Sequence, residues 1–241
     1  MTHALVLHHD ANSTSGTVGR HLAANGWSLT DHRLCDDPRS PAPSRALPDL
    51  DGVDLLVLTG SQWSVYDDES IGAWIHDELD LIRDADDRGI AVFGMCFGGQ
   101  ALAAALGGTV ELAPTPEVGW FEVQSDEPEI SDGPWFQWHF DRFDPPPDAT
   151  VLARSPAGVQ AFRLRRNLGL QFHPELDSQL LDLWVSSDHE ELRAAGIDPV
   201  ALVDRTRREM PRATIATATL LDWFLGQIAS AERSGNLPEH V

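Results

Sequence analysis

Over the first 110 residues, short apolar runs alternate with stretches whose apolar positions follow the helical period. The strand-like runs are Ala4–Leu7, Trp27–His32, Val53–Leu58 and Gly89–Phe93. The helical stretches are Ser15–Asn25, Ile71–Ala85 and Gln100–Leu106. Strands that alternate with helices build parallel units, in which helices cover both faces of one sheet. We therefore predict an α/β fold with a mostly parallel sheet.

The middle of the chain has a different pattern, in which short β-type runs follow one another with few helical stretches between them. Its candidate strands are Val110–Leu112, Trp120–Val123, Thr150–Ala153, Val159–Leu164 and Leu168–Phe172. This pattern predicts a short antiparallel addition at one edge of the sheet. From Leu176 onward the pattern is helical again. The C-terminal helix has an apolar stripe at Ile215, Leu221, Leu225 and Ile228.

The length and composition indicate a single globular domain with an appendage. At about 150 residues per domain, 241 residues exceed one domain but fall short of two. We expect residues 1–185 to form the α/β domain and residues 186–241 to form a helical extension packed on it. Apolar residues make up 42% and charged residues 23% of the chain, which excludes a disordered chain or a coiled coil.

The charge balance narrows the partners. A formal net charge of −21 repels phosphate backbones and anionic lipids, so nucleic acid and membrane surfaces are poor partners. All 17 basic residues are arginine. Codon bias in a GC-rich genome or a salt-adapted host would each explain this. The absence of lysine excludes a Schiff base and a P-loop.

The cysteines and the first residues indicate the cellular compartment in which the protein works. Two cysteines do not make a disulfide framework at this length, and Cys35 lies in a polar segment where we expect it to be incidental. The start of the chain lacks the pattern of a signal peptide, and no apolar run approaches 18 residues. We therefore expect a cytoplasmic protein. The sequence contains no cysteine cluster or metal-ligand motif.

The strongest chemical signal is the segment Gly94–Gln100, where an apolar strand runs into Cys96 and an Ala-rich helix follows. Such a strand–elbow–helix turn forces its central residue into a strained conformation and lifts the side chain above the sheet. The start of the helix favours a thiolate, and the N–H of Phe97 would point toward a substrate oxygen. A buried structural cysteine in a glycine-rich turn is the alternative.

The second signal is the segment Gly169–Glu175, an apolar strand that ends in His-Pro-Glu. In an extended chain His173 and Glu175 lie on the same face, and Pro174 fixes the backbone between them. A carboxylate beside an imidazole holds its tautomer and stabilises its protonated form, and a thiol needs such a base. A surface turn is the alternative reading of this segment taken alone.

Taken together, these two motifs, 77 residues apart, resemble the class I (triad-type) glutamine amidotransferases. Further similarities lie in Leu58–Asp68, in Val118–Trp120 and in Trp138–Asp141, and they are typical of the stand-alone subgroup similar to the amidotransferase domain of GMP synthase. The resemblance covers roughly residues 1–180. It implies a flavodoxin-like fold: a mostly parallel sheet with helices on both faces, extended here by the antiparallel edge addition and the C-terminal helices.

The resemblance also implies roles for individual residues. Cys96 would be the nucleophile, His173 the general base and acid, and Glu175 the orienting carboxylate. The backbone N–H groups of Ser61 and Phe97 would form the oxyanion hole. Substrate-binding positions would be Gly60, Gln100 and His139. The substrate would be glutamine or a γ-glutamyl amide, with no metal or cofactor.

One departure from the family concerns the oxyanion loop, which usually reads Gly-Gly-Pro and here reads Gly60-Ser61-Gln62. Serine can replace glycine there only if the backbone does not need a positive φ. Phe97 stands where the family often has Leu or Tyr, and its ring would narrow the pocket.

Several functions remain open. Ammonia could pass to a separate ATP-dependent synthetase, or the protein could hydrolyse γ-glutamyl amides alone. A non-catalytic binding relative of the fold and a peptidase or deglycase relative are the other hypotheses. Both have counter-evidence: the complete Cys-His-Glu set argues against the first, and Gln100 with His-Pro-Glu argues against the second.

Weaker features have plainer interpretations. His8 and His9 end a strand at the carboxyl edge of the sheet, near where ligands bind in such sheets. One of them could face the pocket, but we expect a solvated role for them. The aromatic residues Trp135, Phe136 and Trp138 either line a pocket or pack against helices. The acidic runs 67–69 and 84–87 are expected to be solvated faces.

Overall fold

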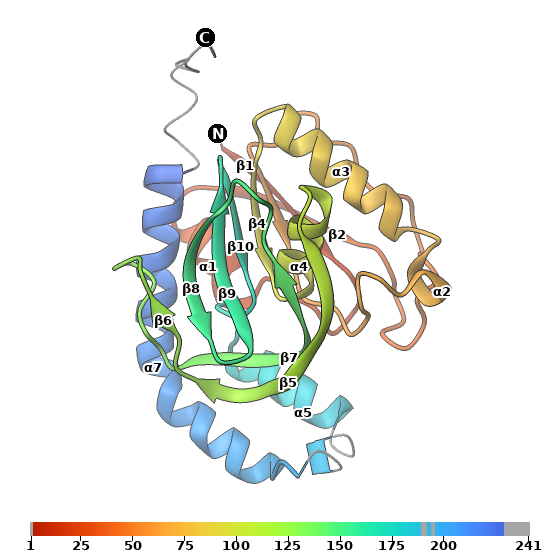
Figure 1. Ribbon diagram of the computed structural model, residues 1–241. Helices are drawn as coiled ribbons and strands as arrows, with labels where there is room; N and C mark the ends of the chain where they lie inside the picture. The colour runs from red at the N-terminus through yellow and green to blue at the C-terminus, as the bar shows by residue number, and fades with distance from the viewer. Residues whose placement is uncertain (1, 189–191, 194–195, 229–241) are drawn as a thin grey trace.

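The central element of the fold is a mixed eight-stranded sheet (Figure 1). The computed structural model describes residues 2–188, 192–193 and 196–228. Five strands are parallel, in the order β2 (Ser28–Arg33), β1 (His3–His8), β3 (Leu55–Leu58), β4 (Ala91–Met95) and β10 (Asn167–Leu170). Antiparallel strands extend the edge after β10, in the order β9 (Gly158–Leu164), β8 (Thr150–Ser155) and β6 (Gln124–Ser125).

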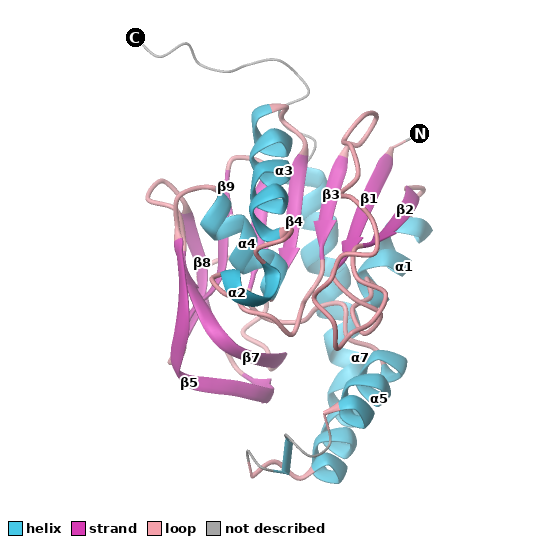
Figure 2. Cartoon of the chain, turned by 90° about the vertical axis from the view of Figure 1, so that its right-hand side faces the viewer, coloured by secondary structure: helices cyan, strands magenta, loops and turns pink. Residues whose placement is uncertain are grey.

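Helices cover both faces of the sheet because successive strand residues point to opposite sides. On β1, Ala4 and Val6 pack with helices α1 (Gly16–Ala24) and α7 (Pro199–Trp223) in one apolar cluster. Leu5 and Leu7 belong to the opposite cluster, with α3 (Ile75–Asp87) and α4 (Phe97–Ala105). Figure 2 shows the parallel strands side by side between these layers. The predicted parallel α/β architecture is confirmed.

The pair β5 (Thr109–Phe121) and β7 (Trp135–Asp144) forms a separate two-stranded antiparallel sheet. The sequence pattern predicted two short strands within and just beyond β5, and none over β7. The inward face of β7 carries Gln137, His139 and Asp141, whereas Trp138 and Phe140 are more exposed. In this part of β7 the buried side chains are polar and the more exposed ones are apolar, which is the reverse of the usual pattern of a half-buried strand.

Some element boundaries differ from the predicted ones. The helix expected over 71–85 is two helices, a short α2 (Asp68–Ile71) and then α3. Strand Leu168–Phe172 was expected in the antiparallel addition, but β10 pairs parallel to β4 on one side and antiparallel to β9 on the other. Helix α4 begins at Phe97, three residues earlier than expected, so it follows Cys96 directly.

The C-terminal part is helical, as the pattern predicted. It contains α5 (Ser178–Ser187) and α7, which continues as a π-helical turn, η1 (Phe224–Ile228). Leu220 and Leu221 pack in the same cluster as the central strands. Residues 229–241 of the predicted extension lie outside the described residues. Within the described helices, none is both long enough and apolar enough to cross a membrane.

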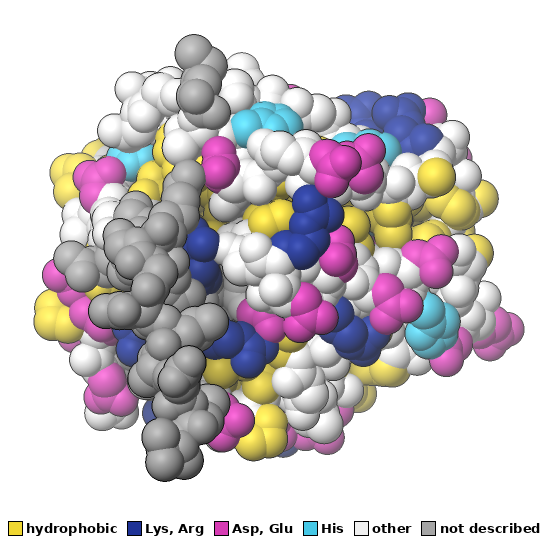
Figure 3. Space-filling model, turned by 90° about the horizontal axis from the view of Figure 1, so that it is seen from above, with side chains coloured by type: hydrophobic (Ala, Val, Ile, Leu, Met, Phe, Trp, Pro, Cys, Tyr) yellow, Lys and Arg dark blue, Asp and Glu magenta, His cyan; other side chains and the backbone are white. Residues whose placement is uncertain are grey.

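The acidic runs lie mostly at the surface. Asp68, Glu69, Asp84 and Asp87 are exposed, and acidic side chains lie between arginines over the face in Figure 3. Asp67 caps α2 by accepting the N–H of Ser70. Asp86 is the exception. It accepts from Asn167 Nδ2 at 2.7 Å and pairs with Arg165, so it joins α3 to the hairpin of β9 and β10.

Candidate active site

Cys96 occupies a strained turn between β4 and α4. Its φ of 52° and ψ of −110° lie in a region that non-glycine residues rarely adopt. The neighbouring glycines make the turn sterically accessible. A Cβ at Gly98 would lie 2.5 Å from Leu58 Cβ, and one at Gly99 would lie 2.3 Å from Leu170 O. Glycine is therefore required at these two positions, and the thiol of Cys96 lies at the start of α4.

His173 and Glu175 form a buried hydrogen-bonded pair. The distance from His173 Nδ1 to Glu175 Oε1 is 2.7 Å, and the two residues are only 5% and 1% exposed. A carboxylate only accepts, so Nδ1–H donates and Nε2 is the nitrogen left to exchange a proton. Nε2 is buried without a hydrogen-bond partner among the described residues. The predicted neighbours His173 and Glu175 therefore do lie together.

Several elements hold the backbone of this pair. The N–H of His173 donates to Phe136 O on β7 at 2.9 Å. The hydroxyl of Thr217 on α7 donates to Pro174 O at 3.0 Å. At the first turn of α1, the N–H of Thr17 donates to Glu175 O at 2.8 Å. The position of the imidazole thus depends on three elements that are far apart in the sequence.

The charge of the ring is set by its neighbours. Burial disfavours an imidazolium, but the negative charges of Glu175 and Cys96 outweigh that effect and raise the pKa of His173 well above its ordinary value. A ring that holds a proton this readily is suited to take one from a thiol in the same site.

Cys96 and His173 line one cavity together with Gly60 and Ser61. A Cβ at Gly60 would lie 3.3 Å from His173 Cε1 and 3.8 Å from Cys96 Cβ, so this loop passes directly beside both groups. Around the sulfur, Gln171 Nε2 lies 3.9 Å and Trp138 O 3.8 Å from Cys96 Sγ.

The oxyanion loop is compatible with serine. Among the described non-glycine residues, only Cys96 and Arg165 have a positive φ, so Ser61 does not need the conformation that favours glycine. Phe97 is the first residue of α4, and its N–H has no acceptor within that helix. Ser61 lines the cavity and Phe97 does not, so the roles of their N–H groups as oxyanion donors stay predictions.

Gln100 and His139 lie behind the cavity and do not line it. Gln100 Nε2 donates to Asp141 O at 3.4 Å and to Gln171 Oε1 at 3.3 Å. His139 has its Nε2 3.1 Å from Glu117 Oε2 and its Nδ1 2.9 Å from Asp141 O. The contact with substrate that the family resemblance implies for these two residues stays a prediction.

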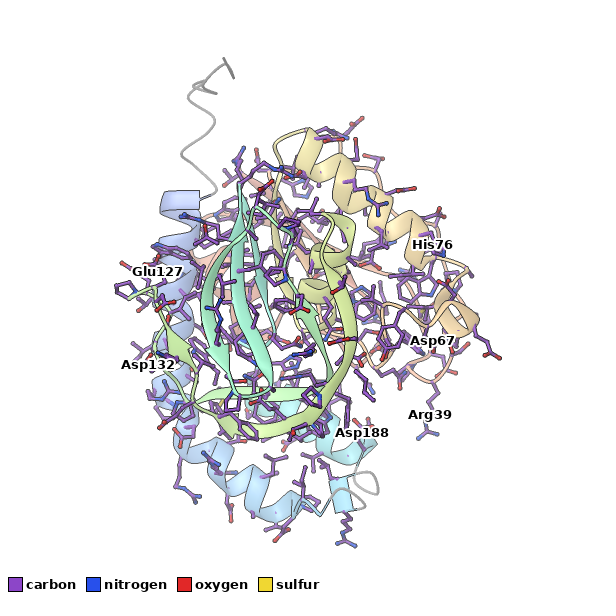
Figure 4. The ribbon with its side chains drawn as sticks, in the orientation of Figure 1. Arg39, Asp67, His76, Glu127, Asp132 and Asp188 are labelled. Atoms are coloured by element: carbon purple, nitrogen blue, oxygen red, sulfur yellow. The ribbon has the colours of Figure 1, made fainter. Side chains whose placement is uncertain are left out.

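Other residues of the cavity were not singled out by sequence. The wall contains Asp10 and Asn12 after β1, and Trp184 and Asp188 at the end of α5, where Figure 4 labels Asp188. The indole of Trp184 packs edge-on against His173, with ring centroids 4.9 Å apart. Asp10 directly follows a strand at the carboxyl edge, a signal that could have identified it. No local pattern announces that α5 reaches the site.

The aromatic segment of β7 serves both of the expected purposes. Trp138 lines the cavity and packs against Trp184, with centroids 5.8 Å apart. Trp135 stacks on Phe172 in the core at 4.4 Å, and Phe136 packs against Trp120 at 5.6 Å.

One expectation about minor residues was wrong, and Cys35 is more buried than its polar segment suggests. His8 and His9 were expected to be solvated, but they are 7% and 0% exposed; the exposed Asp31 accepts the Nε2–H of His8, and the buried Glu78 accepts that of His9. Cys35, placed in a polar loop, is fully buried, and burial raises the pKa of its thiol to about 11. No group of three or more potential metal ligands was found in the described part of the chain.

The fold and the site together identify the family. The chain belongs to the class-I glutamine amidotransferase family, whose model matches residues 20–186. Part of it is similar to the GMP synthase (glutamine-hydrolyzing) of Mycolicibacterium paratuberculosis, at 40% identity over 130 residues. That match covers 50% of this chain and 23% of the relative, so the chain matches about a quarter of the length of that curated protein.

Two solved structures are similar over nearly the whole chain. A glutamine amidotransferase from Methylobacillus flagellatus has a TM-score of 0.82 and 26% identity, and all of both chains are covered. One from Thermotoga maritima has a TM-score of 0.81 and 28% identity, covering 93% of this chain and 98% of that chain. The flavodoxin-like fold and the family resemblance predicted from the sequence are confirmed.

Proposed function

We propose that this protein is a cysteine-dependent amide hydrolase that acts on glutamine or on a γ-glutamyl amide. The observation that carries the proposal is the cavity shared by the strained Cys96 and the buried His173–Glu175 pair. Membership of the class-I family and the name of the glutamine-hydrolysing relative support the same substrate class.

In the first half of the reaction, the thiol proton lies on His173 and the sulfur attacks the γ-carbonyl carbon. The negative charge that develops on the carbonyl oxygen is held by the N–H groups of Ser61 and Phe97, each contributing roughly 3 kcal/mol to lowering the barrier. The tetrahedral intermediate collapses as the C–N bond breaks. His173 gives its proton to the leaving nitrogen as this bond breaks, so the nitrogen departs as ammonia or an amine.

In the second half, water hydrolyses the glutamyl thioester on Cys96. His173 removes a proton from the water as its oxygen attacks the thioester carbon. The C–S bond breaks, the sulfur regains the proton from His173, and glutamate leaves. Glu175 keeps the ring oriented and stabilises its positive charge in both halves.

The cavity wall supplies a basis for recognising the amino-acid end of the substrate. Asp10 and Asp188 place carboxylates on the wall, where they can attract the α-ammonium group of a glutamyl substrate. The indoles of Trp138 and Trp184 line the cavity, and that of Trp184 packs edge-on against the His173 ring. Gly60 allows the loop to approach the reacting centre closely, since a side chain there would press on His173.

The ammonia could be used in two ways. Either a separate ATP-dependent synthetase takes it, which the name of the GMP synthase relative favours, or the protein releases it unaided. An ammonia-release assay over glutamine and a panel of γ-glutamyl amides, with and without candidate synthetases, distinguishes these uses. Activity on glutamine that appears only with a synthetase supports transfer, and activity without one supports a stand-alone hydrolase.

The proposal is tested directly by Cys96→Ala, with Cys35→Ala as the matched control. Loss of the nucleophile is expected to lower amide hydrolysis by at least about 10⁴-fold, whereas the buried Cys35 does not line the cavity and its loss should leave the rate nearly unchanged. A Cys96→Ala protein that hydrolyses its substrate as fast as the parent would refute the proposal.

A further inference from the structure

His9 and Glu78 form a fully buried pair outside the catalytic cavity. Neither side chain has exposed surface, and His9 Nε2 lies 2.9 Å from Glu78 Oε1. Removing two ionisable groups from water is unfavourable, and apolar residues of similar size often give equal or greater stability. Glu78 Oε2 also lacks a hydrogen-bond partner among the described residues. Stability alone therefore explains this pair poorly.

The hydrogen bonds define the charge of the His9 ring. Its Nδ1 lies 3.1 Å from Gly60 O, and a carbonyl oxygen can only accept, so Nδ1 carries a proton. An ionised carboxylate also only accepts, so Nε2 carries one too. Burial opposes this charge, but the negative charge of Glu78, its hydrogen bond and the charge of Asp10 raise the pKa of His9 above its ordinary value. These interactions favour the protonated ring, with Nδ1–H directed at Gly60 O and Nε2–H at Glu78 Oε1.

The bond to Gly60 O also fixes the N–H of Ser61. The two groups belong to one planar peptide unit, and in a trans peptide they point in opposite directions. The cis peptide bond found among the described residues lies elsewhere, at Gly133–Pro134. Gly60 and Ser61 line the cavity, and His9 does not. When the carbonyl is held toward His9, the N–H of Ser61 is directed to the opposite side, where the cavity lies.

The same ring contacts the second proposed oxyanion donor. His9 packs edge-on against Phe97, with ring centroids 4.6 Å apart and an angle of 67° between the planes. Trp74 packs against both rings, with its centroid 5.9 Å from that of His9 and 6.1 Å from that of Phe97. One side chain thus contacts both residues whose N–H groups would bind the oxyanion.

We propose that His9, held by Glu78, is a positioning residue that keeps the Gly60–Ser61 peptide oriented with its N–H toward the substrate oxygen. The inference rests on the proposed function, because an oxyanion forms only if Cys96 attacks an amide. His9 acts through the peptide and not on the substrate, so its loss should affect the transition state more than substrate binding.

Two double variants isolate the hydrogen bond from His9 to Gly60 O, because the longer contact from Thr59 Oγ1 at 3.4 Å is left in place in both. His9→Phe/Glu78→Leu replaces the pair by apolar side chains and removes the donor, whereas His9→Asn/Glu78→Leu keeps an amide N–H near the position of Nδ1. For the first we expect kcat to fall about 10- to 100-fold with KM changed by less than about threefold. The second should recover at least about fivefold of that loss.

Alkylation of Cys96 by iodoacetamide separates this role from general damage to the site. That reaction displaces iodide and forms no oxyanion, so its rate should stay within about twofold of the parent in both double variants. Equal losses of alkylation and hydrolysis, or an unchanged kcat in the Phe/Leu variant, would overturn the inference. If that variant does not fold, His9→Leu and His9→Asn in a Glu78→Gln background repeat the comparison.

Crystal structures of the parent and the double variants give a readout that does not depend on activity. The Gly60 carbonyl should turn away from its parental direction in the Phe/Leu variant and keep it in the Asn/Leu variant. An unchanged carbonyl in the Phe/Leu variant would overturn the inference. A parent that hydrolyses no γ-glutamyl amide would instead overturn the proposed function and leave this structural comparison decisive for His9.

Discussion

His173–Glu175 and His139–Glu117 are two buried histidine–carboxylate pairs with similar chemistry and different surroundings. In the first pair one ring nitrogen is bonded and the other is unpartnered at the edge of the cavity. In the second pair both ring nitrogens are engaged by protein oxygens, and Glu117 also accepts from Gln160 and Ser155. A carboxylate beside an imidazole is therefore not sufficient for catalysis, because the ring also needs a nitrogen left to exchange protons.

The largest expected difference between the pairs is in activity. His173→Ala should lower kcat for amide hydrolysis by at least about 10³-fold, since it removes the proton acceptor and donor. His139→Ala should lower kcat by less than about tenfold but lower the free energy of unfolding by about 1–3 kcal/mol, because buried acceptors lose their donor. Steady-state kinetics and urea unfolding of both variants measure the two effects. A larger loss of kcat from His139→Ala would reverse the assignment.

Replacing Glu175 should lower kcat more than replacing Glu117 does, but the difference should be smaller than that between the two histidines. Glu175→Gln keeps the size of the side chain but removes the charge that stabilises the His173 imidazolium, and kcat should fall about 10²-fold. Glu117→Gln should leave kcat within about threefold, since Glu117 does not line the cavity. Kinetic measurement of the two variants under identical conditions tests this, and equal losses would show that the distinction between the pairs is mistaken.

The smallest expected effect is on the pH dependence of stability. The folded-state pKa of His173 is raised, so its protonated ring stabilises the folded protein fully below the unfolded pKa of about 6.5 and less as the pH rises through the folded pKa. Urea midpoints measured upward from pH 6 should therefore decline more steeply for the parent than for His173→Gln. His9, whose pKa is also raised, contributes the same trend to both proteins. Parallel curves would contradict the assignment of the charge to His173.

Local sequence patterns were sufficient for the elements that depend on near neighbours. The glycines around Cys96 and the apolar strand before it predict the elbow, because the crowding that requires them is local. The i, i+2 spacing of His173 and Glu175 likewise predicts their contact, which the structure has at 2.7 Å. The alternation of strands and helices predicts the parallel sheet, since each apolar face must be covered.

The remaining features depended on contacts between distant parts of the chain. Strand β7 was missed because its inward face is polar, and those polar groups are satisfied by partners such as Gln160 and Glu117, which lie on other strands. His9 was assigned to solvent because its partner Glu78 is 69 residues away, on α3. The position of Trp184 edge-on to the His173 ring follows from the packing of α5. A sequence pattern records how a residue differs from its neighbours along the chain, whereas the partner of a buried polar group is chosen by tertiary packing.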